Sequence, residues 1–202
     1  MAFTYFFRDL QTLELLAEHF VPYVAGRSRI TVWDAGCAMG PEPYTLAIVL
    51  AERMNQYAYK NLRILATDLD NTDQFGKIVT DAEYPKDELV RIPPEVFGKY
   101  FVAGSAPDRY RLCEDVRARV AFRQHDLLSM KAAVDGVSAI VCKNVLLHFQ
   151  PNERVEVIRM FHGALAPGGL IAFEHTQEMP KELGSCFRQL TPDARVYQRI
   201  EA

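Results

Sequence analysis

Apolar residues along the chain follow a helical spacing in four segments. Between residues 10 and 24 they recur at steps of three and four, which predicts an amphipathic helix. The same spacing predicts helices over residues 41–55 and 152–165, and a weaker one over 72–80. The Pro-Gly-Gly sequence at 167–169 is expected to stop the helix of residues 152–165.

Short apolar runs rich in β-branched residues lie between these helices and predict strands. The expected strands occupy residues 30–35, 62–67, 120–123, 137–142, 170–173 and 194–200. Strands that alternate with helices form largely parallel sheets with helices on both faces. We therefore expect an α/β fold with a doubly wound, mostly parallel sheet.

Residues 84–119 interrupt this alternation. They contain several prolines and glycines and no long helical pattern, and residues 109–112 and 116–120 alternate as strands do. We interpret the segment as a small, partly antiparallel inserted subdomain. The expected organisation is one domain over residues 1–202 with this insertion at about residues 84–119.

Composition argues against several classes of protein. The 202 residues include 23 basic and 26 acidic ones, and this net charge of −3 argues against a nucleic-acid-binding protein. No apolar run approaches the ~20 residues of a membrane span, and the N-terminus lacks the pattern of a signal peptide. The cysteines form no C-x-x-C pair and the histidines are scattered, which argues against a metal site. We expect a cytoplasmic protein without membrane insertion.

Glycines or polar residues lie at the carboxyl ends of four consecutive expected strands. Gly36 and Gly40 follow the first strand, and Asp68 ends the second. Asp126 follows the third and Asn144 the fourth. The carboxyl ends of parallel strands meet at one edge of the sheet, where α/β proteins bind ligands.

Each of these residues also has a plainer interpretation when it is taken alone. A carboxylate such as Asp68 can accept from two ribose hydroxyls, but strands often end in aspartate at a turn. Asp126 could accept from an adenine amine or could cap a short helix, and Asn144 could form a turn. The glycine spacing is not G-x-G-x-x-G, and Glu42 stands where a bound phosphate would need N–H groups, which argues against a dinucleotide site.

Taken together, the set resembles the class I S-adenosyl-L-methionine-dependent methyltransferases, and more specifically the CheR-type chemotaxis receptor methyltransferases. The matching sequence motifs occur in the same order as in the family, from Phe3 to about His175. They are YFFRD at 5–9, AGC and PYTLA within 35–47, ATDLD at 66–70, YF at 100–101 and VCKNVLLHF at 141–149. The resemblance implies a seven-stranded Rossmann-like sheet, an inserted three-stranded receptor-contacting subdomain, S-adenosyl-L-methionine as cofactor and S-adenosyl-L-homocysteine as product.

The resemblance also implies roles for individual residues. Arg8 would reach the cofactor's methionyl carboxylate and help to shape the methyl-transfer site, Glu42 would hold the amino group, and Asp68 would bind the ribose. The other implied cofactor-binding residues are Gly36, Cys37 and Gly40 in the first loop, Asp126 and Leu127 at the adenine, and Asn144 and Val145 at the methionyl side.

The chain departs from the family pattern mainly on the substrate side. The family's N-terminal helical domain has no counterpart before Phe3. Pro41 stands where the family's G-E-E-P motif has its first glutamate, and His148 stands where the family has the tyrosine of its Y-F motif. His148 could act as a catalytic base for a weakly acidic acceptor, or could simply replace a tyrosine of similar shape. Without the helical domain, arginines of the insertion remain the candidates for docking a protein: Arg109, Arg111, Arg117 and Arg119.

The implied activity is protein-glutamate O-methylation in a chemotaxis-like signalling pathway, with a chemoreceptor-like protein as substrate. A glutamate carboxylate is ionised at neutral pH, so in-line displacement from a sulfonium needs no strong base. Two alternatives remain open at this point: a methyltransferase with a changed, small-molecule acceptor, and a cofactor-binding sensor or scaffold without catalysis.

Overall fold

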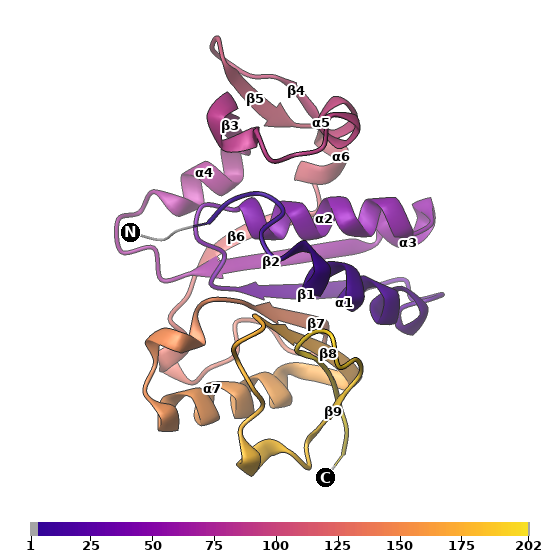
Figure 1. Cartoon of the computed structure of the whole chain (residues 1–202), viewed down its shortest axis with the longest axis vertical. Helices are drawn as coiled ribbons and strands as arrows, with labels where there is room; N and C mark the ends of the chain where they lie inside the picture. The colour runs from indigo at the N-terminus through magenta and orange to yellow at the C-terminus, as the bar shows by residue number, and fades with distance from the viewer. Residues whose placement is uncertain (1–3, 202) are drawn as a thin grey trace.

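A seven-stranded sheet forms the centre of the protein (Figure 1). The computed structural model describes residues 4–201, so Phe3, where the resemblance begins, lies outside the described part. The strands are β1 (Ile30–Ala35), β2 (Leu62–Asp68), β6 (Val120–Gln124), β7 (Val137–Cys142), β8 (Leu165–Phe173), β9 (Phe187–Gln189) and β10 (Val196–Arg199). Their order in the sheet is β6-β2-β1-β7-β8-β10-β9.

The sheet is mostly parallel, as the sequence predicts. β1 pairs in parallel with β2 and β7, β2 with β6, and β7 with β8. β10 runs antiparallel to both of its neighbours, β8 and β9. The chain passes from β1 outward to β2 and β6 and then returns to β7, so the strand order reverses between β1 and β7. Such a reversal opens a crevice at the carboxyl ends of the strands.

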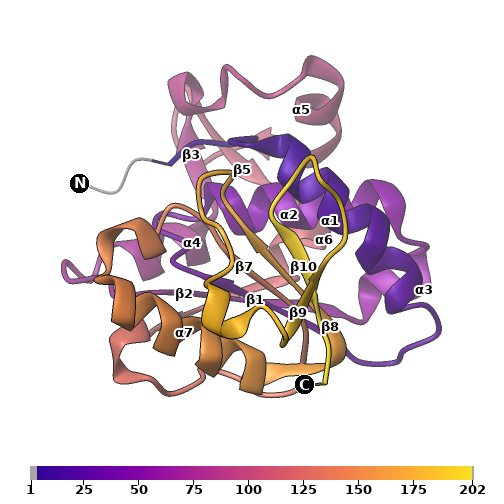
Figure 2. The same cartoon turned by 60° about the horizontal axis from the view of Figure 1, so that its bottom comes forward.

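Helices cover both faces of the sheet, which confirms the doubly wound fold. The α-helices are α1 (Leu10–Tyr23), α2 (Pro41–Arg53), α3 (Gln56–Lys60), α4 (Phe75–Asp81), α5 (Pro94–Tyr100), α6 (Glu114–Arg117) and α7 (Pro151–Ala164). Short 3₁₀ helices include η1 (Lys86–Leu89), η2 (Leu127–Ser129), η3 (Leu146–His148) and η4 (Lys181–Leu183). Figure 2 shows α1 and α2 on one face and α7 on the other. α7 ends before the Pro-Gly-Gly sequence, which forms part of β8.

The periodicity of each helix matches the face that it buries. In α1, Leu13, Leu16 and Phe20 are almost fully buried, at the three- and four-residue steps of the sequence pattern. On the opposite face of the sheet, the ring of Trp33 packs edge-on against Phe161 of α7, with centroids 5.2 Å apart. The Trp33 indole also donates a hydrogen bond to the Thr67 hydroxyl at 2.8 Å, which ties β1 to the end of β2.

A second, smaller sheet lies between β2 and β6 in the sequence. Its strands are β3 (Glu83–Pro85), β4 (Phe101–Ala103) and β5 (Arg109–Leu112), in the antiparallel order β3-β5-β4. The expected strand over residues 116–120 is wrong except at its last residue, because residues 114–117 form α6, a turn follows, and β6 begins only at Val120. At α6 the Cys113 carbonyl accepts from the amides of Val116 and Arg117, and only one side chain of the helical turn, Val116, is buried.

The arginines expected to dock a protein all have partners within the chain. Arg109 and Arg111 pair with the buried carboxylate of Glu83, at 2.9 and 3.2 Å. Arg117 lies 3.6 Å from Glu114, and Arg119 donates to backbone carbonyls at the end of α3. Their guanidinium groups are therefore engaged in local contacts, although two of them share the single carboxylate of Glu83.

Among residues 4–201, no helix has the length and the apolar composition needed to cross a membrane.

Candidate cofactor site

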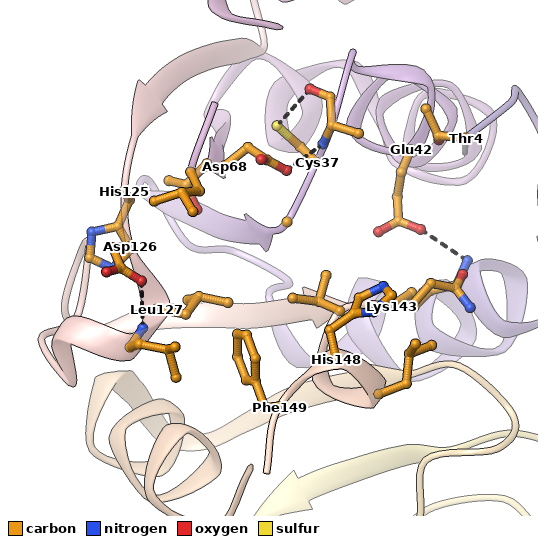
Figure 3. A pocket seen from close by; sticks show the side chains of 18 of the residues that line it. Thr4, Cys37, Glu42, Asp68, His125, Asp126, Leu127, Lys143, His148 and Phe149 are labelled. Carbon is orange, nitrogen blue, oxygen red and sulfur yellow. Dashed lines mark hydrogen bonds and ion pairs between the residues drawn. The ribbon is translucent and has the colours of Figure 1, made fainter. Parts of the chain in front are cut away.

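A pocket of about 490 Å³ lies at the carboxyl ends of β1, β2, β6 and β7 (Figure 3). Its volume is in the range of small-molecule sites. Of the residues that the sequence assigns to the cofactor or to catalysis, all but Gly40 line it: Arg8, Gly36, Cys37, Glu42, Asp68, Asp126, Leu127, Asn144, Val145 and His148. Figure 3 shows Asp68, Asp126 and Leu127 on one side of the pocket and Glu42 with Lys143 on the other.

The loop between β1 and α2 forms one wall of the pocket. The amides of Gly36 and Cys37 both donate to the carbonyl of Thr67, at 2.7 and 3.0 Å. Gly36 has a φ of +97°, and a Cβ atom at this position would lie 2.1 Å from Cγ2 of Val145. Only glycine therefore allows this loop to approach the loop that follows β7.

Gly40 lies at the far end of the same loop and does not line the pocket. Its φ is +99°, and a Cβ atom there would meet the Tyr84 hydroxyl at 2.7 Å and Val79 at 3.0 Å. The glycine is needed for the turn into α2 and for close packing against the small sheet. It shapes the pocket through the loop rather than by facing a ligand.

Asp68 holds the loop in place from the end of β2. Its Oδ2 accepts from the amide of Ala38 at 2.9 Å, and its Oδ1 accepts from the amide of Asp70 at 3.2 Å. A carboxylate has about four lone-pair positions, so the two oxygens can still accept from a pair of ligand hydroxyls. The residue can thus serve the loop and a ribose together.

Asp126 caps a short helix, which is one of the two roles that the sequence leaves open. Its Oδ1 accepts from the amide of Leu128 at 2.8 Å at the start of η2. The neighbouring Leu127 is largely buried and also lines the pocket. This arrangement places an apolar side chain next to a carboxylate, which suits a planar ring that carries a polar edge.

Lys143 organises the opposite side of the pocket, although no pattern in the sequence marks it as a site residue. Its side chain is 0% exposed, and its ammonium lies 3.1 Å from Oε2 of Glu42 and 3.6 Å from Asp9. The same nitrogen donates to the carbonyl of Arg8 at 3.2 Å. Burial raises the pKa of Glu42, while Lys143 and Arg8 act in the opposite direction. Lys143 therefore joins the first loop, the N-terminal segment and the end of β7.

Asn144 adopts a left-handed conformation directly after β7. Its φ is +59°, and its amide donates to Oε2 of Glu174 at 2.9 Å. Glu174 follows β8, the neighbouring strand, and it is 5% exposed. This carboxylate fixes the turn that directs Asn144 into the pocket. The following turn, η3, brings His148 to the pocket wall.

Asp34 is a buried carboxylate below this pocket, in β1. It is 0% exposed, and neither of its side-chain oxygens has a hydrogen-bond partner among the described residues. Burial and the nearby charge of Glu42 raise the pKa of Asp34 well above its ordinary value, although Lys143 opposes this. The folded state therefore binds a proton at Asp34 more tightly than the unfolded chain does.

Asp34→Asn is expected to raise the melting temperature by an amount that grows with pH. Because the pKa of Asp34 is raised on folding, its contribution to stability is greatest below its unfolded pKa and is lost as pH rises towards the folded value. Asparagine removes that loss. The test is the melting temperature of both proteins between about pH 4 and pH 9.

Asp70→Asn provides a control of opposite sign. Although burial opposes the shift, the backbone amides of Gly76, Phe75 and Gln74 lower the pKa of Asp70. That variant should lose stability near neutral pH, and the deficit should shrink as the pH falls through the folded-state pKa. A stability gain in Asp34→Asn that stays constant across the pH range would contradict the assignment of a titrating carboxylate.

Comparison with known proteins identifies the family to which this pocket belongs. Residues 2–195 match the family model described as "CheR methyltransferase, SAM binding domain". The chain belongs to the CheR methyltransferase family. S-adenosylmethionine is accordingly the cofactor of this domain.

Relatives of the CheR chain come from several bacteria. Chemotaxis protein methyltransferase 1 of Pseudomonas aeruginosa is 32% identical over 178 residues, which cover 83% of this chain and 63% of the relative. The chemotaxis protein methyltransferase of Escherichia coli is 31% identical over 177 residues, with 86% and 60% covered. The chain thus spans about three fifths of the length of these relatives.

Solved structures share the fold at lower sequence identity. The rRNA methyltransferase aviRa of Streptomyces viridochromogenes superposes with a TM-score of 0.56 at 15% identity and covers 99% of this chain and 85% of its own. PKMT2 of Rickettsia typhi, solved with AdoHcy, gives a TM-score of 0.50 at 14% identity, covering 87% and 27%. Both support the class I methyltransferase architecture of the CheR chain.

Proposed function

We propose that this chain is the catalytic domain of a protein-glutamate O-methyltransferase that acts on a chemoreceptor-like protein in the cytoplasm. The observation that carries the proposal is the pocket itself, since residues of four CheR motifs, at 5–9, 35–37, 66–70 and 141–149, come together there from separate segments of the chain. The relatives are named chemotaxis protein methyltransferases, which supports a protein of chemotaxis as the methyl acceptor.

The residues of the pocket fit the chemical groups of the cofactor. Glu42 is a mostly buried carboxylate, 12% exposed, suited to an amino group, and Asp68 is suited to the two ribose hydroxyls. Leu127 offers an apolar surface for the adenine. Arg8, which reaches the pocket from the N-terminal segment, supplies a positive charge for the methionyl carboxylate. Asn144 and Val145 line the methionyl side.

The protein's part in the reaction is mainly to position the reactants and exclude water. When bound, S-adenosylmethionine supplies a methyl group carried on a positively charged sulfonium. A glutamate acceptor is already ionised at neutral pH, so no residue of the pocket has to remove a proton. His148 and Phe149 form the wall at η3, where they can shield the acceptor carboxylate from water.

Methyl transfer should yield an ester, which gives the proposal a direct test. The chain is incubated with methyl-labelled S-adenosylmethionine and a purified receptor signalling domain, and the labelled protein is then treated with mild base. We expect label in the receptor, released as methanol. Label that resists base would indicate N-methylation and contradict the proposal. The control is a receptor in which the acceptor glutamates are replaced by alanine.

His148 favours one competing function, a methyltransferase with a less acidic small-molecule acceptor. An imidazole at the pocket wall could take a proton from such an acceptor, which a tyrosine at the same place would do poorly at neutral pH. If the acceptor is a glutamate, His148→Tyr should leave the rate within about threefold of the wild type. If His148 is a base, the same variant should be about 10²–10⁴-fold slower, and the fall in rate at low pH that comes from protonation of the base should disappear.

We further propose that residues 84–119 act as the receptor-contacting insertion of the domain. Two exposed apolar side chains of this segment, Val90 and Val102, are 74% and 51% exposed. The arginines of the segment already make contacts within the chain, so we expect these exposed apolar side chains to supply part of the docking surface.

A further inference from the structure

Tyr84 of the small sheet reaches the loop that forms the cofactor pocket. The side chain is 1% exposed, and its hydroxyl donates to the carbonyl of Met39 at 2.9 Å. The neighbouring Gly40 leaves no room for any larger residue beside this hydroxyl. A residue of the insertion is therefore built into the turn between β1 and α2.

The loop that Tyr84 holds is under backbone strain. Ala38, which lines the pocket, has a φ of +47°, in the left-handed region that residues other than glycine rarely adopt. Such a conformation is unfavourable and persists only where its surroundings enforce it. Asp68 binds the amide of Ala38 on one side at 2.9 Å. Tyr84 binds the next residue, Met39, on the other side.

Tyr84 also contacts the segment that carries Arg8. Phe6 packs edge-on against the Tyr84 ring, with centroids 4.9 Å apart, and against Phe101 of β4 at 5.6 Å. The next residue, Phe7, donates its amide to the Thr45 hydroxyl at 3.1 Å. Arg8 follows and lines the pocket. One tyrosine thus contacts both the loop and the N-terminal segment, which form different walls of the same pocket.

We propose that Tyr84 is a positioning residue through which the inserted sheet sets the affinity of the pocket for S-adenosylmethionine and its product. It holds the strained turn at Ala38 and supports Phe6, and so places the pocket walls before the cofactor arrives. The inference rests on the cofactor-binding role of the pocket. The insertion then contributes to cofactor binding as well as to the proposed contact with the receptor.

The chain offers a matched pair of tyrosines for the test. Tyr44 is also 1% exposed, its ring lies 6.5 Å from that of Tyr84, and its hydroxyl also donates to a backbone carbonyl. That carbonyl belongs to Val79 of α4, at 2.6 Å, and not to the pocket loop. Removing either hydroxyl breaks one buried hydrogen bond, but only one of the two bonds restrains the cofactor loop.

The experiment compares Tyr84→Phe with Tyr44→Phe by calorimetric titration with S-adenosylhomocysteine and by thermal unfolding. Both variants should lower the melting temperature to a similar extent, since each loses one buried hydrogen bond. Only Tyr84→Phe should raise the dissociation constant, by about fivefold to tenfold. A dissociation constant of Tyr84→Phe within twofold of the wild type, or an equal rise in both variants, would overturn the proposal.

Ala38→Gly provides a second readout that a purely structural role would not change. Glycine adopts the left-handed conformation readily, so the loop no longer depends on Tyr84 to hold it. In the Ala38→Gly background, Tyr84→Phe should raise the dissociation constant by less than twofold. An undiminished effect there would show that Tyr84 does not act through the loop. Absence of binding by the wild-type chain would instead remove the cofactor assignment on which the inference rests.

Discussion

Lys143→Met is expected to cost about 3–5 kcal/mol of unfolding free energy, because it leaves buried carboxylate charge without its partner. The Lys143 side chain is 0% exposed and lies 3.1 Å from Glu42, with Asp9 beyond it at 3.6 Å. Methionine fills a similar volume but supplies neither charge nor donors. The variant should also lose affinity for S-adenosylhomocysteine, since the carbonyl of Arg8 is released. Urea unfolding and calorimetric titration measure the two effects.

A double variant separates the lost charge from the lost packing. Lys143→Met with Glu42→Gln removes the carboxylate that the single variant leaves unpaired, so it should regain most of the stability. It should not regain cofactor affinity, because Glu42 is proposed to hold the amino group. A double variant that is no more stable than Lys143→Met would show that the Glu42–Lys143 pair is not the source of the loss.

Gly36→Ala is expected to weaken S-adenosylhomocysteine binding by at least roughly a hundredfold, the equivalent of about 3 kcal/mol. The new Cβ atom would lie 2.1 Å from Cγ2 of Val145, and the φ of +97° is unfavourable for alanine. Either the loop or the Val145 side chain must move, and both line the pocket. Equilibrium titration measures the affinity, and circular dichroism checks that the variant folds.

Gly26→Ala is the matched control for backbone strain. Gly26 has a φ of +77°, but a Cβ atom there would have no neighbour within 4 Å, and the residue does not line the pocket. This variant should lose about 1 kcal/mol of stability and keep its cofactor affinity. Gly36→Ala combined with Val145→Ala should recover part of the binding. Equal loss of binding in Gly26→Ala and Gly36→Ala would argue against the steric explanation.

The central sheet could be predicted because most of its parallel strands are apolar runs that are followed by a helix or a turn. The alternation at residues 116–120 was misleading, because a single buried side chain, Val116, satisfies one turn of helix as well as a strand. Helices such as α3, of 5 residues, and strands such as β9, of 3 residues, are too short to produce a periodic signal.

The members of the pocket could be predicted because parallel strands bring their carboxyl ends to one edge. That rule gathers Asp68, Asp126 and Asn144 without further information. It cannot find Lys143 or Tyr84, whose partners come from distant segments and depend on how side chains pack. Asp34 was also missed, since an aspartate at the end of a strand gives no indication in the sequence that it will be buried with no hydrogen-bond partner among residues 4–201.

The hydrogen bond between Lys143 and the carbonyl of Arg8 joins residues 135 positions apart in the sequence, and this separation affects folding during synthesis. At a synthesis rate of about 5–20 residues per second, Arg8 is made roughly 7–27 seconds before Lys143. During that time α1 cannot pack against β8 and β10, which follow Lys143 in the chain, so apolar side chains of the nascent chain are open to chaperones. A ribosome stalled before the end of β7 would therefore display a chain that cannot yet retain its cofactor.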